Sequence, residues 1–232
     1  MGTKRTPNED PDEALRLFEA EAAYAHGVFL LALGDVAGSV EASERSLEWK
    51  PDYPPAVLTM GSIEYQRGNE ELGARLFETL ITLPDDDGDL WEILDRAGDF
   101  LIDERRYAEG LELYASACLR FPDRVPLLQG LACCAGHEEA FDRSIEAARK
   151  ALELEPDRAD LTSDLGWALF QAGRLEEAEE TLRRAIALDP DDARARENLR
   201  LCRAARAGDD SPLAGGDGAD GDPDGERAEE VA

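Results

Sequence analysis

Hydrophobic residues recur along this chain at intervals of three and four, the spacing of one face of an α-helix. The clearest stretch is 159–192, where two such runs are separated by Gly173 and the second run ends at Pro190. Glycine and proline interrupt helices, so they mark a turn and an end. Among the small and apolar positions of this stretch are Leu165, Gly166, Ala178, Leu182 and Ala185. The pattern predicts two short helices joined by a tight turn.

The same pattern repeats along most of the chain, and a proline closes each copy. These prolines are Pro51, Pro84, Pro122, Pro156 and Pro190, in steps of 33, 38, 34 and 34 residues. The longer second step contains the acidic loop 85–89. Helix pairs at this period stack on their neighbours, because no single pair can bury its apolar side alone. The predicted units are about 20–53, 54–90, 91–124, 125–158 and 159–192.

Both ends of the array receive separate predictions. A long opening helix is expected to start at Pro11 with Asp10 as its cap, because proline is favoured at the first helical position. A capping helix is expected over 193–207, with Leu199 and Cys202 facing inward and its arginines in solvent. Residues 1–10 are expected to be disordered. Residues 208–232 contain nine acids against one arginine and almost nothing apolar, which predicts a disordered acidic tail.

These units resemble the tetratricopeptide repeat family, over roughly residues 20–207. The resemblance lies in a Leu-Gly pair in the first helix, a small residue where the helices cross, and the terminal proline. The units depart from the family pattern in three ways. The usual first-helix Trp is absent from every unit, Arg105 and Glu139 stand where a turn glycine is usual, and Ser43 and Ala148 stand where a large residue is usual. The resemblance implies an all-α fold, a right-handed α-solenoid of about five helix-turn-helix units. It also implies that the first helices line a concave face where peptides commonly bind.

Composition narrows the expected partners. Acids outnumber bases 53 to 25, giving a formal charge of −28. Such a surface repels nucleic acid and anionic lipid, so neither is expected as a partner. No apolar run approaches the roughly 20 residues that cross a bilayer, and the first residues lack a secretory signal. Four cysteines without regular spacing predict no disulfide framework and no metal site. We therefore expect a reduced, cytoplasmic protein without cofactor or membrane association.

Several short motifs are better explained by chance. Residues 2–6 match an N-myristoylation pattern that is too short to be specific. Residues 216–221 match a dinucleotide fingerprint, and 215–220 the start of a calcium nonapeptide, but neither has the flanking elements its ligand needs. Residues 229–232 resemble the Glu-Glu-Val-Asp tail of chaperones without its final Asp. No catalytic motif is present, so an enzyme is not expected. His26 falls at an inward position and is predicted to be a packed core residue.

Aligned positions of the first helices single out a candidate groove. Its predicted residues are Tyr24, Tyr65, Glu92, Asp95, Asp99, Asp103, Gln129, Trp167 and Phe170. The four acids follow one another at intervals of three, four and four, and like charges so placed destabilise a helix by roughly 0.2–0.5 kcal/mol a pair. One interpretation is an ordinary solvated face. The other is a site for a basic partner, with the aromatic residues as apolar or cation–π anchors.

Two functional hypotheses follow. The first is a scaffold or adaptor that binds a basic, partly apolar peptide segment in the groove. The second is an assembly or export chaperone that masks a client protein. The aligned groove positions of the five units hold no Lys or Arg, which disfavours clamp binding of an acidic C-terminus. The oligomeric state and the identity of the partner are not determined by these patterns.

Overall fold

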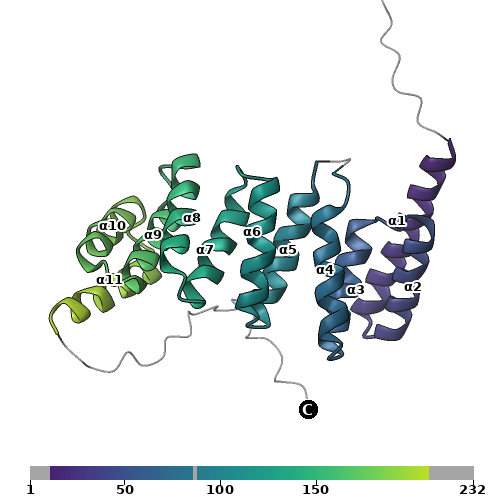
Figure 1. Ribbon diagram of the computed structural model, residues 1–232, viewed down its shortest axis with the longest axis horizontal. Coiled ribbons are helices and arrows are strands. Elements are labelled where there is room, and N and C mark those ends of the chain that lie inside the picture. The colour runs from purple at the N-terminus through teal and green to yellow at the C-terminus, as the bar shows by residue number, and fades with distance from the viewer. Residues whose placement is uncertain (1–10, 86–87, 209–232) are drawn as a thin grey trace, which may run out of the picture.

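The computed structural model describes residues 11–85 and 88–208. These residues form eleven α-helices and no strand, arranged as one row of helix pairs (Figure 1). In chain order the helices are α1 Pro11–Ala32, α2 Val36–Trp49, α3 Pro54–Gln66, α4 Glu70–Thr82, α5 Leu90–Asp103, α6 Tyr107–Arg120, α7 Val125–His137, α8 Phe141–Leu154, α9 Ala159–Gln171, α10 Leu175–Leu188 and α11 Ala193–Arg206. The prediction of an all-helical solenoid of five helix pairs and a final helix is confirmed.

The first helices of successive pairs form a continuous layer. Helix α3 contacts α5, α5 contacts α7, α7 contacts α9, and α9 contacts α11. The second helices α4, α6, α8 and α10 pack against this layer from the other side. We call the surface of α3, α5, α7, α9 and α11 that points away from the second helices the first-helix face. This layering places every groove residue of the second to fifth pairs on a helix of one layer.

Small residues set how closely paired helices cross. A Cβ atom added at Gly166 would lie 2.6 Å from Cγ of Leu182, which is nearer than two carbon atoms can approach. At Gly61 an added Cβ would overlap the ring of Phe77. The glycine of the recurring first-helix pair is therefore required by the partner side chain that fills the crossing.

The turns inside the pairs share a left-handed residue. Gly34, Gly68 and Gly173 have φ angles of 81°, 83° and 72° at this position. Arg105 and Glu139 occupy the same place in the third and fourth pairs, both with φ 57°. A side chain is disfavoured there because its Cβ crowds the following carbonyl oxygen. The turns of the third and fourth pairs thus keep the left-handed backbone conformation although they lack glycine.

The first pair, α1 and α2, crosses on very small side chains. Ser43, Ser39 and Ser46 of α2 are all fully buried. Ser46 donates a hydrogen bond of 2.8 Å to the carbonyl oxygen of Ala20, whereas the hydroxyls of Ser39 and Ser43 have no hydrogen-bond partner among the described atoms. Ser43 stands where a large residue is usual, and its small side chain lets α1 approach α2 closely.

The prediction that His26 is a packed core residue is wrong. His26 is exposed on α1, and Nη2 of Arg45 lies 3.2 Å from its Nδ1. Gly27, the next residue, takes the buried position against α2. An error of one residue on a helix turns a side chain by about 100°, enough to move it from the core to the surface.

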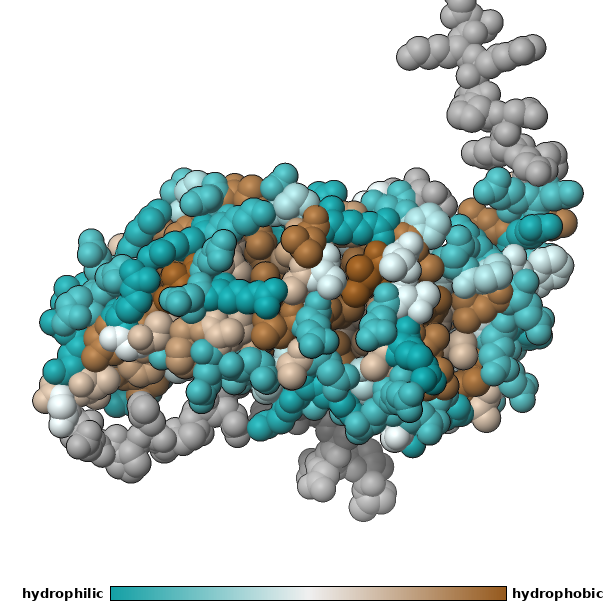
Figure 2. All heavy atoms as spheres, in the orientation of Figure 1, coloured by the Kyte–Doolittle hydropathy of each residue, from teal (hydrophilic) through white to brown (hydrophobic). Residues whose placement is uncertain are grey.

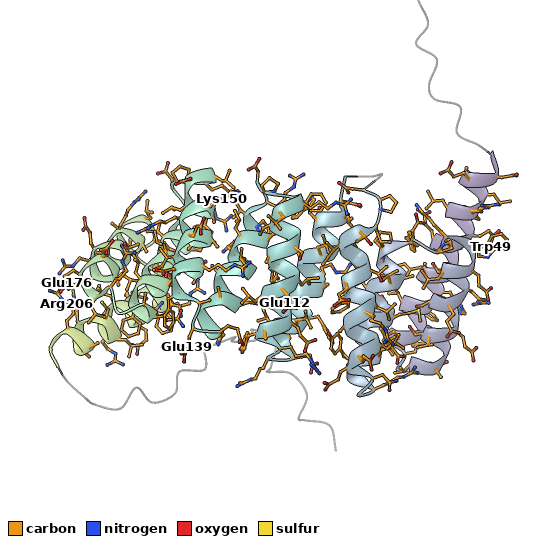
Figure 3. The ribbon with its side chains drawn as sticks, in the orientation of Figure 1. Trp49, Glu112, Glu139, Lys150, Glu176 and Arg206 are labelled. Atoms are coloured by element: carbon orange, nitrogen blue, oxygen red, sulfur yellow. The ribbon has the colours of Figure 1, made fainter. Side chains whose placement is uncertain are left out.

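Helix α11 covers the last pair through apolar and charged contacts. Leu199 is 8% exposed and Cys202 is fully buried, as predicted for an inward face. Asp192 caps the helix by accepting a hydrogen bond of 3.0 Å from the amide of Ala195. Arg203 and Arg206 both pair with Glu179 of α10, whose side chain is only 8% exposed. The end of the row is thereby closed by a buried carboxylate and two arginines, with Arg206 also near Glu176 (Figure 3).

Hydrophilic side chains cover much of the surface in the view of Figure 2, and hydrophobic surface lies between them along the row. In the part of the chain that the structure describes, no helix has the length and apolar character needed to span a membrane. The predictions made for residues 1–10 and for the tail beyond Gly208 concern residues outside the described ones.

Candidate functional site

The four acids of α5 form one row. Glu92, Asp99 and Asp103 are exposed, and Asp95 is half-buried. Their spacing of three, four and four residues places them on one side of the helix. The first acid, Glu92, lies in the first turn, where the positive end of the helix dipole favours a negative charge. The other three have no such support.

Tyr114 of α6 shows which side of α5 this is. Its ring is fully buried between α5 and α7, so close to Gly98 and Gly130 that a Cβ on either glycine would overlap it. The ring thus extends from the second-helix layer through the first-helix layer. Its hydroxyl group donates to Oδ1 of Asp99 at 2.9 Å, with the carbonyl oxygen of Asp95 at 3.2 Å. Asp95 and Asp99 therefore lie toward the first-helix face.

The electrostatics of this pair are unfavourable for its negative charge. Burial, together with the neighbouring charge of Asp99, raises the pKa of Asp95 to about 6, and the Tyr114 hydrogen bond partly opposes this rise. Burial also raises the pKa of Asp99, with a further contribution from Asp103. Among the described residues, no cation contributes to either shift. Burial and neighbouring negative charge thus both disfavour ionisation of this pair, and no basic side chain in the part of the chain that the structure describes offsets them.

A polar network connects the next three first helices. Gln129 of α7 donates a hydrogen bond of 3.0 Å to Oδ2 of Asp164 on α9. Arg194 of α11 donates one of 3.1 Å to the other oxygen of the same carboxylate. The predicted residue Gln129 is therefore on this layer, but its amide is already engaged.

Asp164 and Arg194 are absent from the predicted groove. Asp164 follows one residue after an aligned groove position, and Arg194 belongs to the capping helix, which lies beyond the five units. Counting the same positions into α11 places Arg194 at the second position of a sixth first helix. The face therefore carries a cation at its α11 end, beyond the five units whose groove positions contain none.

The aromatic candidates have different environments. The rings of Trp167 and Phe170 on α9 are half-buried and tilted by 35°, with centroids 5.2 Å apart. Phe170 also packs against the core. The ring of Tyr24 is half-buried and meets Tyr53 edge to face at 5.6 Å. Trp167 and Phe170 are thus a pair of predicted groove aromatics that stay partly exposed on a first helix.

Tyr65 is part of the core, not an exposed anchor. It is 8% exposed, and its ring packs against Phe77 and Phe100 at centroid distances of 5.4 and 5.7 Å. Its hydroxyl group donates to Glu109, and the guanidinium of Arg106 lies 4.7 Å from the ring centroid. The repeat pattern could not separate this role from a groove role, because large residues occupy both kinds of position.

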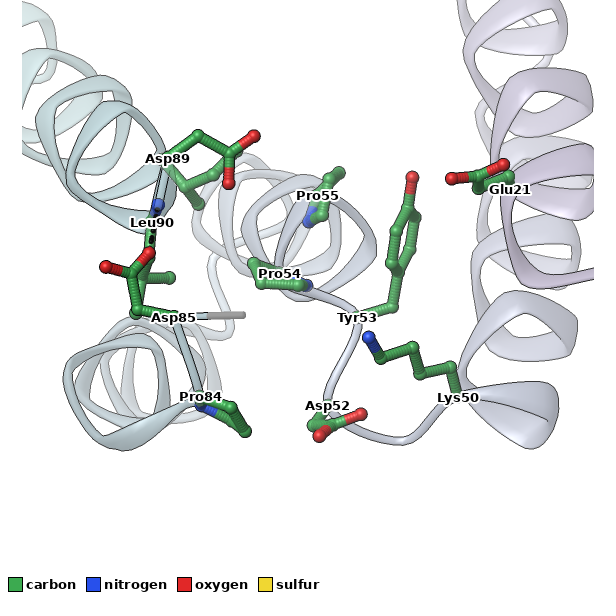
Figure 4. A pocket seen from close by; sticks show the side chains of 11 residues that line it. Glu21, Lys50, Asp52, Tyr53, Pro54, Pro55, Pro84, Asp85, Asp89 and Leu90 are labelled. Atoms are coloured by element: carbon green, nitrogen blue, oxygen red, sulfur yellow. Dashed lines mark hydrogen bonds between the residues drawn. The ribbon is translucent and has the colours of Figure 1, made fainter. Parts of the chain in front are cut away.

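A small cavity of about 150 Å³ lies beside the start of α3 and α5. Tyr53 stands in it between the carboxylate of Glu21 and the ring of Pro55 (Figure 4). Its other charged lining residues are Lys50, Asp52, Asp85 and Asp89. The cavity continues the negative charge of α5 toward the first pair. Among the described residues, no group of three or more His, Cys, Asp or Glu side chains is placed to hold a metal ion.

Comparison with known proteins agrees with this architecture. Residues 137–201 match a family described as "Tetratricopeptide repeat". A search of curated proteins finds no match. The solved structure of YrrB, described as a TPR protein with an unusual peptide-binding site, aligns with a TM-score of 0.57 and 18% identity over 78% of this chain and 92% of that one. MamA from Desulfovibrio magneticus RS-1 aligns with a TM-score of 0.55 and 16% identity, over 75% and 97%. At these identities the similarity concerns the fold.

Proposed function

Because this chain is a tetratricopeptide repeat protein, we propose that it is a protein-interaction scaffold that binds a basic, partly apolar peptide segment on its first-helix face. The observation that carries the proposal is the pair Asp95 and Asp99. Burial raises the pKa of both carboxyl groups, the charge of Asp99 adds to the shift of Asp95, and no cation of the described residues offsets either shift.

A basic side chain of a partner would offset the unfavourable negative charge of these two carboxylates. An opposite charge within about 4–6 Å favours the ionised form of a carboxylate, which burial has disfavoured. An arginine suits the site best, because its planar guanidinium can donate to both carboxylates at once. The hydroxyl of Tyr114 holds Asp99 in place for this contact by donating to one of its oxygens. The acids of α5 thus supply the recognition of charge.

The aromatic pair of α9 supplies the apolar part of the contact. Trp167 and Phe170 lie two helices further along the layer than Asp95. Neighbouring helices pack 8–10 Å apart, so the two sites are separated by roughly 16–20 Å. An extended peptide covers that distance in about five or six residues. The preferred ligand therefore has a basic residue and a large apolar residue separated by about that number of positions.

The similarity of fold to YrrB supports the proposal of a peptide ligand. That protein is described as having an unusual peptide-binding site. Because the identity between the two chains is low, the binding residues of YrrB cannot be assigned to positions of this chain. The chemistry of the ligand is therefore taken from the residues of this chain.

The proposal is tested with a fluorescein-labelled peptide that carries two arginines and two leucines about six positions apart, measured by fluorescence anisotropy. The test variant is Asp95→Lys with Asp99→Lys. The matched control is Glu112→Lys with Glu146→Lys, which makes the same charge change at exposed positions of α6 and α8. Figure 3 labels Glu112. Circular dichroism checks that both variants retain their helices.

We expect the test variant to weaken binding by tenfold or more, since close charge pairs at interfaces are worth several times thermal energy. The control should stay within about threefold, because distant exposed charges are screened over about 10 Å. Equal weakening by both variants would show that the peptide responds to total charge, and the proposed site would be wrong.

A further inference from the structure

Helix α1 carries an apolar stripe that none of the described elements covers. Leu15, Phe18 and Phe29 are 52%, 64% and 59% exposed. Ala22, Ala25 and Ala32 of the same helix are exposed as well. We call these six residues the α1 stripe. Phenylalanine and leucine so exposed along one helix are unusual, because a contiguous apolar patch on a soluble protein marks a contact surface.

The stripe lies on the side of α1 that the array does not use. The residues of α1 that are buried against α2 are Ala20 and Gly27. At 100° per residue, these two residues point almost opposite to Phe29 and Ala22. Packing of the solenoid therefore does not explain the stripe.

The two ends of the row differ in how they are closed. At the far end, α11 buries Leu199 and Cys202 and leaves its arginines at the surface. The terminal elements of a repeat array need such a polar outer surface, because the apolar side of the last unit has no neighbour. Helix α1 instead presents Phe18 and Phe29 outward. The α1 end thus has the chemistry of an interface.

The spacing of the α1 stripe identifies the kind of contact. Its residues follow one another at intervals of three, four, three, four and three, which is the a and d pattern of a coiled coil. From Leu15 to Ala32 the helix extends roughly 25 Å at 1.5 Å per residue. This pattern fits another helix of the same form along most of its length.

We propose that the α1 stripe is a homodimer interface, in which α1 of one copy packs antiparallel to α1 of a second copy. When a and d positions alternate across a two-fold axis, Phe18 meets Phe29 of the partner and Leu15 meets Ala32. Ala22 meets Ala25 at the axis itself. Large layers therefore flank small ones, which lets the helices approach closely at the centre and stack their rings on both sides.

Charge at the border of the stripe favours this antiparallel orientation. Glu19 and His26 lie one heptad apart on the same edge, and Arg45 of α2 adjoins His26 at 3.2 Å. Antiparallel packing brings Glu19 of each copy alongside His26 and Arg45 of the other. The two-fold axis produces this favourable contact twice. Parallel packing would leave Glu19 of both copies at the same level.

Such a dimer is closed, because the same patch serves both copies and no apolar end remains. It adds to the proposed function without depending on it. The first-helix faces of two copies would be linked in one particle, so that a partner with two binding segments gains avidity. Loss of the dimer should leave the affinity of a single peptide unchanged, which keeps the two proposals separable.

The test is sedimentation equilibrium of the full chain at micromolar concentrations. We expect a particle of twice the chain mass of 25.4 kDa. Phe18→Asp with Phe29→Asp should reduce the mass to that of one chain, with an unchanged helical spectrum, because both side chains are exposed. Leu119→Asp is the matched control, since Leu119 of α6 is 87% exposed outside the stripe and its variant should remain dimeric. A monomeric wild-type chain, or a dimer that survives both aspartates, would overturn the proposal.

Orientation is tested by cross-linking in a Cys133→Ser background, which removes an exposed thiol. Ala22→Cys and Ala25→Cys chains, distinguished by a tag on one of them, are mixed and oxidised. Antiparallel packing predicts that the mixed disulfide between Cys at these two positions dominates. Disulfides between identical chains in preference to mixed ones would contradict the antiparallel arrangement.

Discussion

The phenolic hydroxyl of Tyr114 donates a hydrogen bond of 2.9 Å to the carboxylate of Asp99, although the two residues belong to different layers of the solenoid. The contact requires the ring to pass between Gly98 and Gly130, where no side chain would fit. One buried tyrosine thereby joins the core of the array to the acidic surface of α5. A change at the buried residue Tyr114 should consequently also alter the ionisation of the acids on the first-helix face.

Replacing Tyr114 by phenylalanine should separate these two contributions. Because the hydrogen bond lowers the pKa of Asp95 and Asp99, its loss should raise both, as measured by carboxyl chemical shifts in an NMR titration. The free energy of unfolding should fall by about 1.5–3 kcal/mol, the range for a hydrogen bond to a charged group. Tyr24→Phe is the control, and it should shift neither pKa. Unchanged titration of both aspartates in Tyr114→Phe would contradict the described contact.

Asp95→Asn should stabilise the protein in a pH-dependent manner. Burial raises the pKa of Asp95 to about 6, so the folded state binds this proton more tightly than the unfolded chain does. The wild-type protein therefore loses stability as the pH rises from about 4, the ordinary carboxyl pKa, through 6. The difference in melting temperature between variant and wild type should be small at pH 4 and reach a plateau above pH 6. Asp189→Asn, at an exposed position outside the site, is the control for a general charge effect. A constant difference across this range would refute the account.

The two strained turns predict stabilising glycine substitutions. Arg105→Gly and Glu139→Gly should each raise the free energy of unfolding by about 1 kcal/mol, because a left-handed residue with a side chain costs about 1–2 kcal/mol, part of which is offset by the greater freedom of unfolded glycine. Gly173→Ala, at the same position in the fifth pair, should lower it. Urea unfolding followed by circular dichroism measures all three. Destabilisation by both glycines would mean that the side chains of Arg105 and Glu139 contribute more than the strain.

The buried serines of α2 predict opposite effects for similar changes. Ser43→Ala removes a buried hydroxyl without a partner among the described atoms and should stabilise the first pair by about 1 kcal/mol. Ser46→Ala removes the hydrogen bond to Ala20 and should destabilise it by a similar amount. Because repeat arrays can unfold from one end, amide hydrogen exchange in α1 and α2 is the appropriate measurement. Equal effects of the two substitutions would contradict the described hydrogen bonding.

The ion pairs of Glu179 should stabilise the packing of the capping helix α11 on α10. The hydrogen bond from Arg203, followed by that from Arg206, lowers the pKa of Glu179. Its contribution to stability is thus present at neutral pH and is lost as the pH falls through this lowered value. Glu179→Gln should accelerate amide exchange in α11 at pH 7, with little change in α3–α6. Glu197→Gln, which affects an exposed pair within α11, is the control and should have a much smaller effect.

The period of the chain was sufficient to predict the helix pairs, because the 34-residue spacing of glycines and prolines reflects local turn geometry. This spacing alone places Arg105 and Glu139 in turns, and their positive φ angles agree with it. The sequence pattern predicted less well which side chains of a helix are buried and which are exposed. Tyr65, predicted for the groove, is buried, because large residues occupy both core and groove positions. His26, predicted for the core, is exposed, because one residue of rotation exchanges core and surface on a helix.

Contacts between units could not be predicted from the pattern of one unit. The hydrogen bond from Tyr114 joins residues in different helices, and its path through Gly98 and Gly130 depends on three helices at once. Asp164 was missed because its two partners, Gln129 and Arg194, come from the units on either side. The α1 stripe likewise becomes visible only when α2 is seen to occupy the opposite side of α1.

Photo-cross-linking tests the central claim most directly. The arginine–leucine peptide, carrying a benzophenone beside its arginines, is irradiated with the full chain, and the cross-linked residues are identified by mass spectrometry. If the first-helix face binds the peptide, the cross-links will fall on α5 and α7 near Asp99, and the Asp95→Lys, Asp99→Lys variant will lose them. Cross-links concentrated on α4, α6 and α8 would place binding on the opposite face and contradict the proposed function.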